Sequence, residues 1–107
     1  MIARLWSART TPAVSDSYLL HFEQSVRPEL RRVDGFLGAT VCTRLLPDAV
    51  EILVTTYWNS FAAIDAFAGT DRESAVVAAE AAALLIDFDK RVRHYEVALT
   101  EFPPVEA

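Results

Sequence analysis

The chain has 107 residues, the size of one domain, and 52% of them are hydrophobic. Its 10 Lys and Arg residues against 15 Asp and Glu residues give a net charge of −5. The longest basic cluster is the short group Lys90, Arg91 and Arg93, so nucleic acid is not expected as a partner. So many apolar residues in so small a domain indicate that another subunit covers part of its surface.

The segments that bear on location and redox state are few. The start, MIARLWSART, lacks the apolar core of a signal peptide. The longest apolar stretch, 75–86, is interrupted by Glu80 and is too short to span a bilayer. The single cysteine, Cys42, lies in an apolar run, which predicts a small buried side chain in a reducing compartment. We therefore expect one soluble, cytoplasmic domain over residues 1–107, with no membrane partner.

The first two elements are a strand and a helix. Residues 1–6 are short and apolar, which predicts a strand. Thr-Thr-Pro at 10–12 and the serines that follow are typical of a helix start. Apolar residues then recur at every fourth position of the helix: Val14, Tyr18, Phe22, Val26 and Leu30. Pro28 lies inside this pattern and should kink the helix or end its regular part early.

The middle of the chain predicts a hairpin and a short helix. A turn at 34–35 precedes a strand over 36–45, and a short connection leads to a third strand over 51–58. Ser60 is suited to begin the next helix as its N-cap, and Gly69 is suited to end it.

The last third predicts a longer helix and a final strand. Residues 70–73 have the spacing of a capping box, which predicts a helix start. Helical spacing then continues through Val77, Ala81, Leu84, Leu85 and Phe88. Residues 92–100 predict the fourth strand, and two prolines favour an extended tail over 101–107.

This order, β-α-β-β-α-β, predicts an α+β fold of the ferredoxin-like type with a four-stranded antiparallel sheet. Right-handed crossovers put the third strand between the first and second, and the first strand between the third and fourth. The second and third strands have no charged face except at their ends. A sheet with one face in solvent should instead alternate apolar and polar residues along each strand. We therefore expect a homodimer, in which two sheets close an α/β barrel; a monomer with an apolar sheet is the alternative.

The first and fourth strands should be neighbours. If the numbers of paired residues sum to 100, Arg4 lies opposite Glu96 and Trp6 lies opposite His94. Opposite charges across a ladder favour that register. The Arg4–Glu96 ion pair is then either a structural clasp inside the dimer or the polar floor of a substrate pocket.

His94 is the candidate catalytic residue, because an imidazole suits proton abstraction at neutral pH. A structural role for this lone histidine on a strand is the alternative. The candidate substrate-binding residues are aromatic, or lie beside aromatic positions, and would wall a site for a flat molecule: Trp6, Tyr18, His21, Trp58 and Phe67. Core packing also explains much of this aromatic surface. His, Cys and carboxylate residues show no metal-site spacing, so no metal is expected.

Four stretches of the chain resemble the antibiotic biosynthesis monooxygenase-like family of dimeric α/β-barrel proteins. They are MIARLW at the start, DGFLGATV at 34–41, YWNSFAAIDAFAG at 57–69 and LLIDFDKRVRHYEV at 84–97. The resemblance implies a homodimer with a pocket between each sheet and its helices. The family includes oxygenases that oxidise polyketide quinols without metal or flavin, haem-degrading enzymes, and members with no known activity.

The haem-degrading branch requires an Asn on the first strand, and a Trp and a His after the third. Here the first strand ends at Trp6-Ser7, and the other two positions fall near Phe67 and Val77. The imidazole ligand is missing, so haem degradation by that mechanism is not expected.

Two functions remain open. The first is a monooxygenase without cofactor that acts on a small aromatic or quinol-like metabolite. The second is a non-catalytic homodimer that binds a small hydrophobic ligand, or a relative with non-oxidative chemistry such as isomerisation or cyclisation. A buried base with a shifted pKa would favour the enzyme.

Overall fold

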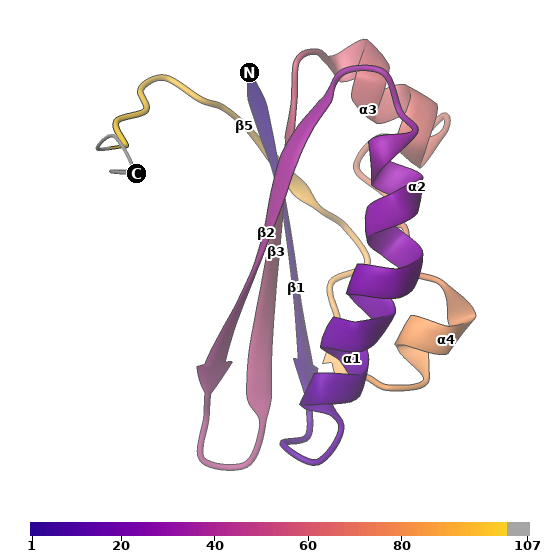
Figure 1. Ribbon diagram of the computed structural model, residues 1–107, viewed down its shortest axis with the longest axis vertical. Coiled ribbons are helices and arrows are strands. Elements are labelled where there is room, and N and C mark those ends of the chain that lie inside the picture. Colours follow the sequence, from indigo (N-terminus) through magenta and orange to yellow (C-terminus); the bar gives the residue numbers. More distant parts are fainter. Residues whose placement is uncertain (103–107) are drawn as a thin grey trace, which may run out of the picture.

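The computed structural model describes residues 1–102, so the last five residues of the predicted extended tail lie outside the described part. Its elements follow one another along the chain as strands, helices and one π-helical turn (Figure 1). They are β1 (Ile2–Thr10), α1 (Ser15–His21), η1 (Phe22–Val26), α2 (Arg27–Arg31), β2 (Phe36–Leu45), β3 (Val50–Trp58), α3 (Phe61–Ala68), α4 (Ala79–Ala82), β4 (Asp87–Phe88) and β5 (Arg93–Glu96).

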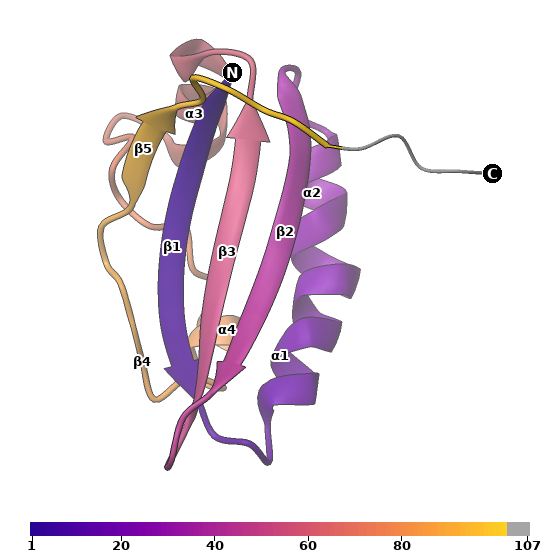
Figure 2. The same ribbon diagram turned by 90° about the vertical axis from the view of Figure 1, so that its left-hand side faces the viewer.

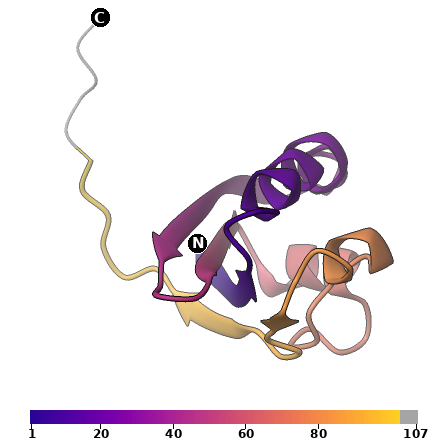
Figure 3. The ribbon, with the colours of Figure 1, turned by 90° about the horizontal axis from the view of Figure 1, so that it is seen from below.

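The strands form one antiparallel sheet in the order β2-β3-β1-β4, and β5 also pairs with β1. This confirms the predicted fold class and the predicted strand order. The helices lie on one side of the sheet, as the view from below shows (Figure 3). Figure 2 looks onto the opposite face, which no helix covers.

The central strand β3 shows how the two faces differ. Its even-numbered residues are buried beneath the helices, and Ile52 and Trp58 have no exposed surface. Its odd-numbered residues, such as Leu53 and Tyr57, lie on the uncovered face and are partly exposed. Because side chains alternate along a strand, one face of the sheet is core and the other is open in a single chain.

The first strand is longer than the sequence predicts. It continues to Thr10, whose side chain is fully buried and donates a hydrogen bond to the Leu84 carbonyl at 2.7 Å. Thr10 therefore finishes β1 rather than starting a helix. The helix begins at Ser15, and its N-cap, Val14, makes no side-chain capping bond.

The long helix passes from α1 through η1 into α2, with Tyr18, Phe22 and Leu30 buried. Pro28 does not end the helix, which continues to Arg31. Its predicted effect is a local irregularity, the π-helical turn η1, which lies just before the proline. A proline cannot donate the usual bond to the carbonyl four residues earlier, and a wider turn accommodates this loss.

The short helix α3 has the ends that its sequence predicts. The Ser60 hydroxyl accepts a hydrogen bond from the Ala63 backbone N–H at 3.2 Å, which caps the first turn. Gly69 follows the last turn with a φ of 87°, a backbone conformation that favours glycine.

The predicted long helix after residue 70 is wrong, because only the four residues of α4 are helical. Residues 73–75 instead run beside 90–92. The Ala75 N–H donates to the Lys90 carbonyl at 2.9 Å, and the Val92 N–H donates to the Glu73 carbonyl at 2.8 Å. These backbone groups cannot also form helical bonds. The predicted fourth strand, 92–100, is present only as the shorter β5, and the two-residue strand β4 lies before it, inside the predicted helix.

Cys42 is exposed, which corrects the expectation of a buried side chain. It lies opposite Leu53 in the β2–β3 pair, on the face that no helix covers. The apolar run around it marks an uncovered sheet face rather than core.

Trp58 lies at the centre of the core. Its indole N–H donates to the Thr56 hydroxyl at 2.8 Å, and its ring lies 5.3 Å from the Phe36 ring and 5.4 Å from the Phe67 ring. A fully buried indole with a satisfied N–H contributes both apolar area and a fixed orientation.

We predict that Trp58→Ala lowers the free energy of unfolding by about 3–5 kcal/mol, because it leaves a cavity in the core. Leu45→Ala is the control, since Leu45 is 76% exposed and its loss should change stability by less than about 0.5 kcal/mol. Urea unfolding of both variants is the measurement. Equal losses would contradict the central place of Trp58.

A second prediction concerns alkaline pH. Tyr18 is 3% exposed, and burial raises its pKa to about 12. An unfolded tyrosine ionises near pH ~10, so the stability that Tyr18 contributes is complete below that pH and is lost as the pH rises to about 12. Between these pH values the wild type should lose about 2 kcal/mol relative to Tyr18→Phe, measured by denaturant unfolding at each pH. Parallel pH profiles for the two proteins would show that the phenol is not buried as described.

Candidate functional site

A cavity of about 70 Å³ lies between the sheet and the helices. Its walls come from β1, β3, the long helix, α3, α4 and the irregular segment before α4. The lining residues that bear on function are Arg4, Trp6, Tyr18, His21, Phe67 and Val77. The walls are therefore mainly apolar and aromatic, with two basic side chains, Arg4 and His21, among them.

Aromatic rings form one end of the cavity. The Trp6 and Tyr18 rings are stacked, with centroids 6.2 Å apart and planes at 28°. The Trp6 indole N–H donates to the Asp89 carbonyl at 2.8 Å, which fixes the ring. The His21 ring lies 6.4 Å from that of Tyr18. A flat apolar molecule would find rigid aromatic contacts here.

His21 carries an unsatisfied atom. Its Nε2 is buried and is the one buried side-chain nitrogen or oxygen in residues 1–102 that lacks a hydrogen-bond partner. A buried polar atom without a partner costs about 1–3 kcal/mol, so this nitrogen has a reason to accept a partner from outside the chain.

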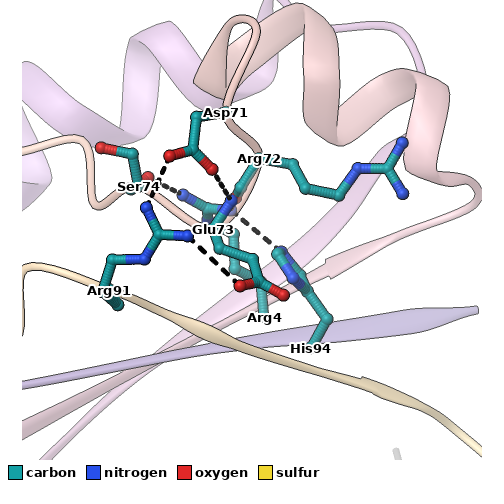
Figure 4. Close-up of polar contacts among 7 residues, drawn as sticks. All are labelled: Arg4, Asp71, Arg72, Glu73, Ser74, Arg91 and His94. Carbon is teal, nitrogen blue, oxygen red and sulfur yellow. Dashed lines mark hydrogen bonds and ion pairs between the residues drawn. The ribbon is translucent and has the colours of Figure 1, made fainter.

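Arg4 is the buried charge of the site. It is 5% exposed, and the other buried polar residues in the described part, Thr10 and Thr56, are neutral. Its guanidinium donates to the carbonyls of Arg72 and of Ser74, the latter at 2.8 Å, and lies 2.9 Å from His94 Nε2 (Figure 4). Burial lowers the pKa of Arg4 to about 10, so the group is still charged at neutral pH.

His94 lies behind Arg4 rather than in the cavity wall. A guanidinium can only donate, so His94 Nε2 must accept, and the ring is assigned as neutral with its proton on Nδ1. Burial, and then the charge of Arg4, lower the pKa of His94 and favour this neutral form. The candidate base is therefore already engaged by the protein.

The predicted register between β1 and the last strand is wrong by two residues. Arg4 lies opposite His94, and Ile2 lies opposite Glu96. Glu96 is exposed, and the ion pairs of the described residues do not include Arg4 with Glu96. The observed register leaves Glu96 in solvent and places His94, whose Nε2 accepts from Arg4, beside the buried guanidinium.

The other predicted site residues divide into two groups. Trp6, Tyr18, His21 and Phe67 line the cavity together, although they come from three separate elements. Trp58 does not line it, because Phe36 and Phe67 cover its ring in the core.

Residues 76–78 form a wall of the cavity that the sequence did not predict. Val76 is 50% exposed, and neither Val76 nor Val77 takes part in the backbone hydrogen bonds of the described chain. A wall with so few backbone contacts is the part that opens most easily. Such movement is needed to admit a ring system, since about 70 Å³ is well below the cavity of roughly 150 Å³ that binds one benzene.

In residues 1–102, no three His, Cys, Asp or Glu side chains gather to hold a metal ion. The same residues contain no helix long and apolar enough to cross a membrane.

Comparison with known structures finds the same fold in several proteins. A monooxygenase from the gene ActVA-Orf6 of Streptomyces coelicolor, in complex with nanaomycin D, is 20% identical with a TM-score of 0.69, over 96% of this chain and 92% of that one. The haem-degrading protein MhuD of Mycobacterium tuberculosis, with two haems bound, is 19% identical with a TM-score of 0.64, over 95% and 100%. A protein of unknown function from Nitrosomonas europaea is 17% identical with a TM-score of 0.60, over 97% and 95%.

Among curated proteins no match is found. The family model described as antibiotic biosynthesis monooxygenase matches residues 1–79, which include β1, the long helix, β2, β3 and α3. The chain therefore belongs to the antibiotic biosynthesis monooxygenase family.

Proposed function

We propose that this protein is an oxygenase that oxidises a small aromatic or quinol-like molecule with O₂ and without a cofactor. The observation that carries the proposal is the aromatic cavity between the sheet and the helices, with the His21 imidazole in its wall. Membership of the family and the likeness to a monooxygenase that binds nanaomycin D support it.

The oxidation requires few catalytic groups from the protein. A phenol or enol that loses its proton becomes electron-rich enough to pass an electron to O₂. For an anthrone, the ring methylene loses two hydrogens and gains one oxygen atom, and the second oxygen atom leaves with those hydrogens as water. The protein must hold the ring, accept the first proton and exclude bulk water.

We assign the proton acceptor to His21 rather than to His94. His21 lies in the cavity wall, and its buried Nε2 has no partner in the described residues. His94 was the candidate from sequence, but its Nε2 accepts from Arg4. In this assignment His94 is a positioning residue, which holds the guanidinium at the cavity edge.

The side chains do not fit the haem ligation of the haem-degrading branch. Phe67 and Val77 line the cavity where that branch needs a Trp and a His. An apolar valine cannot ligate iron, so no step through haem is part of the proposal.

The engagement of His94 by Arg4 favours one further candidate, the non-catalytic binding of a small hydrophobic ligand. If His21 also fails to act as a base, the cavity would bind a ligand without oxidising it. Isomerisation or cyclisation without O₂ belongs to the same outcome.

We also propose that the protein is a homodimer, in which a second copy covers the open sheet face. That face carries a groove lined by Tyr57 and by exposed apolar side chains, including Leu37, Leu99 and Phe102. The segment after β5 crosses this face, as Figure 2 shows. An apolar face of this kind is rarely left in water.

For the reaction, we predict that the purified protein accelerates O₂ uptake in the presence of an anthrone or a dihydroxynaphthalene. His21→Gln should lower the rate about 100-fold, because general-base catalysis contributes at least that much, whereas His94→Gln should lower it less. An oxygen electrode gives the rates, with heat-denatured protein as the background. If His94→Gln loses more activity than His21→Gln, the general base is His94 and not His21. If no substrate gives O₂ uptake, the oxygenase proposal is contradicted and the ligand-binding function is the one supported.

For assembly, we predict that light scattering gives about twice the mass of one chain. Leu37→Glu should yield monomers, because it places a charge in the apolar groove. Leu20→Glu is the matched control, since Leu20 is 52% and Leu37 56% exposed and Leu20 lies on α1, on the other side of the sheet. A monomeric wild type, or equal effects of the two substitutions, would contradict the proposed interface.

A further inference from the structure

Arg4 differs from the arginines around it, because its charge is buried and has no carboxylate partner among residues 1–102. Its three hydrogen bonds go to two backbone carbonyls and one neutral imidazole. The ion pairs found in residues 1–102 do not include it. Burial is the cause of its lowered pKa, and no nearby carboxylate offsets that effect.

The neighbouring carboxylates are already bound to other arginines. Arg72 donates two hydrogen bonds to the Asp65 carboxylate, at 2.9 and 2.8 Å, and lies over the Phe61 ring. Arg91 pairs with Asp71 at 2.5 Å and with Glu73 at 3.3 Å (Figure 4). Arg72 and Arg91 thus hold all three of these carboxylates, and none of them pairs with Arg4.

The guanidinium also has donors that the described residues leave unused. It has five N–H groups, and three are used in the bonds described above, which leaves the Nε–H and one Nη2–H without an acceptor in the described residues. Arg4 lines the cavity, and its guanidinium carbon lies 5.9 Å from the centre of the Phe67 ring.

A partner subunit on the open sheet face would not neutralise this charge. Arg4 lies opposite Thr56 in the β1–β3 pair, and both residues belong to the face beneath the helices. The open face is the opposite one. An anion that binds Arg4 would therefore come from the cavity and not from the open face.

We propose that Arg4 selects aromatic ligands that carry an anionic oxygen, a carboxylate or a phenolate, with His21 as the second polar contact. This inference rests on the proposed function, because it concerns the same cavity. The aromatic walls hold the ring, and the guanidinium fork accepts the anionic oxygen, an arrangement for which arginine is better suited than lysine. A phenol bound in this way loses its proton more easily, because Arg4 stabilises the phenolate.

The test compares two ligands of the same shape, 2-naphthoate and the neutral 2-naphthamide, by calorimetry with the wild-type protein at neutral pH. Naphthoate should bind about tenfold tighter or more, since hydrogen bonds to charged groups contribute that much. Equal affinities, tighter binding of the amide, or no binding of naphthoate would each overturn the proposal. This comparison needs no variant.

Two variants then test whether Arg4 causes the preference for naphthoate over naphthamide. Arg4→Gln should remove it, and Arg72→Gln should retain it, because the Arg72 guanidinium is held by Asp65 and only its carbonyl contacts Arg4. Circular dichroism checks that each variant is folded. Preference retained in a folded Arg4→Gln variant would overturn the role of Arg4.

The outcome is separable from that of the proposed oxidation. Preferential binding of naphthoate without O₂ uptake from any quinol would support the anion site and contradict the oxygenase. O₂ uptake with equal affinities for naphthoate and naphthamide would support the oxygenase and contradict the anion site.

Discussion

The contact between the Arg4 guanidinium and the backbone at residues 72–74 determines much of this structure. Arg4 is on β1, and it binds the Arg72 and Ser74 carbonyls while His94 on β5 accepts from it. One side chain thus joins the first strand, the last strand and the connection between α3 and α4. Because those carbonyls are held by a side chain, the connection lies against β1 instead of forming the helix that its sequence favours.

The same contact shapes the cavity. Where a regular helix would have packed its apolar side against the sheet, residues 76–78 form a wall with few backbone hydrogen bonds. The aromatic side chains of β1, α1 and α3 then face a small space rather than a filled core. A buried cation at the edge of that space has a large desolvation cost, which a bound anion would offset.

The sequence predicted those parts of the fold that depend on local pattern. The limits of β2, the Ser60 cap and the Gly69 end of α3 are all read from neighbouring residues, and the strand order follows from the order of the elements. The helix after residue 70 could not be judged in this way. Its apolar spacing is real, but the backbone groups that would form it are bonded to Arg4 and to residues 90–92.

The candidate site was predicted in part for a related reason. A shift of two residues leaves every side chain on the same face, so alternation could not distinguish Glu96 from His94 as the residue opposite Arg4. Aromatic composition likewise could not separate Trp58, whose ring is covered by Phe36 and Phe67, from Trp6, which reaches the cavity. Burial and strand register depend on the packing of the whole chain, and they determine which of the candidate residues lie together in the cavity.

The most direct measurement is a crystal structure of the protein with 2-naphthoate bound. If the cavity is the ligand site, the carboxylate will lie within hydrogen-bonding distance of the Arg4 guanidinium, the rings will lie between Trp6 and Phe67, and residues 76–78 will have moved outward. A carboxylate bound elsewhere, or an Asp or Glu side chain of a second copy bound to Arg4, would contradict this assignment.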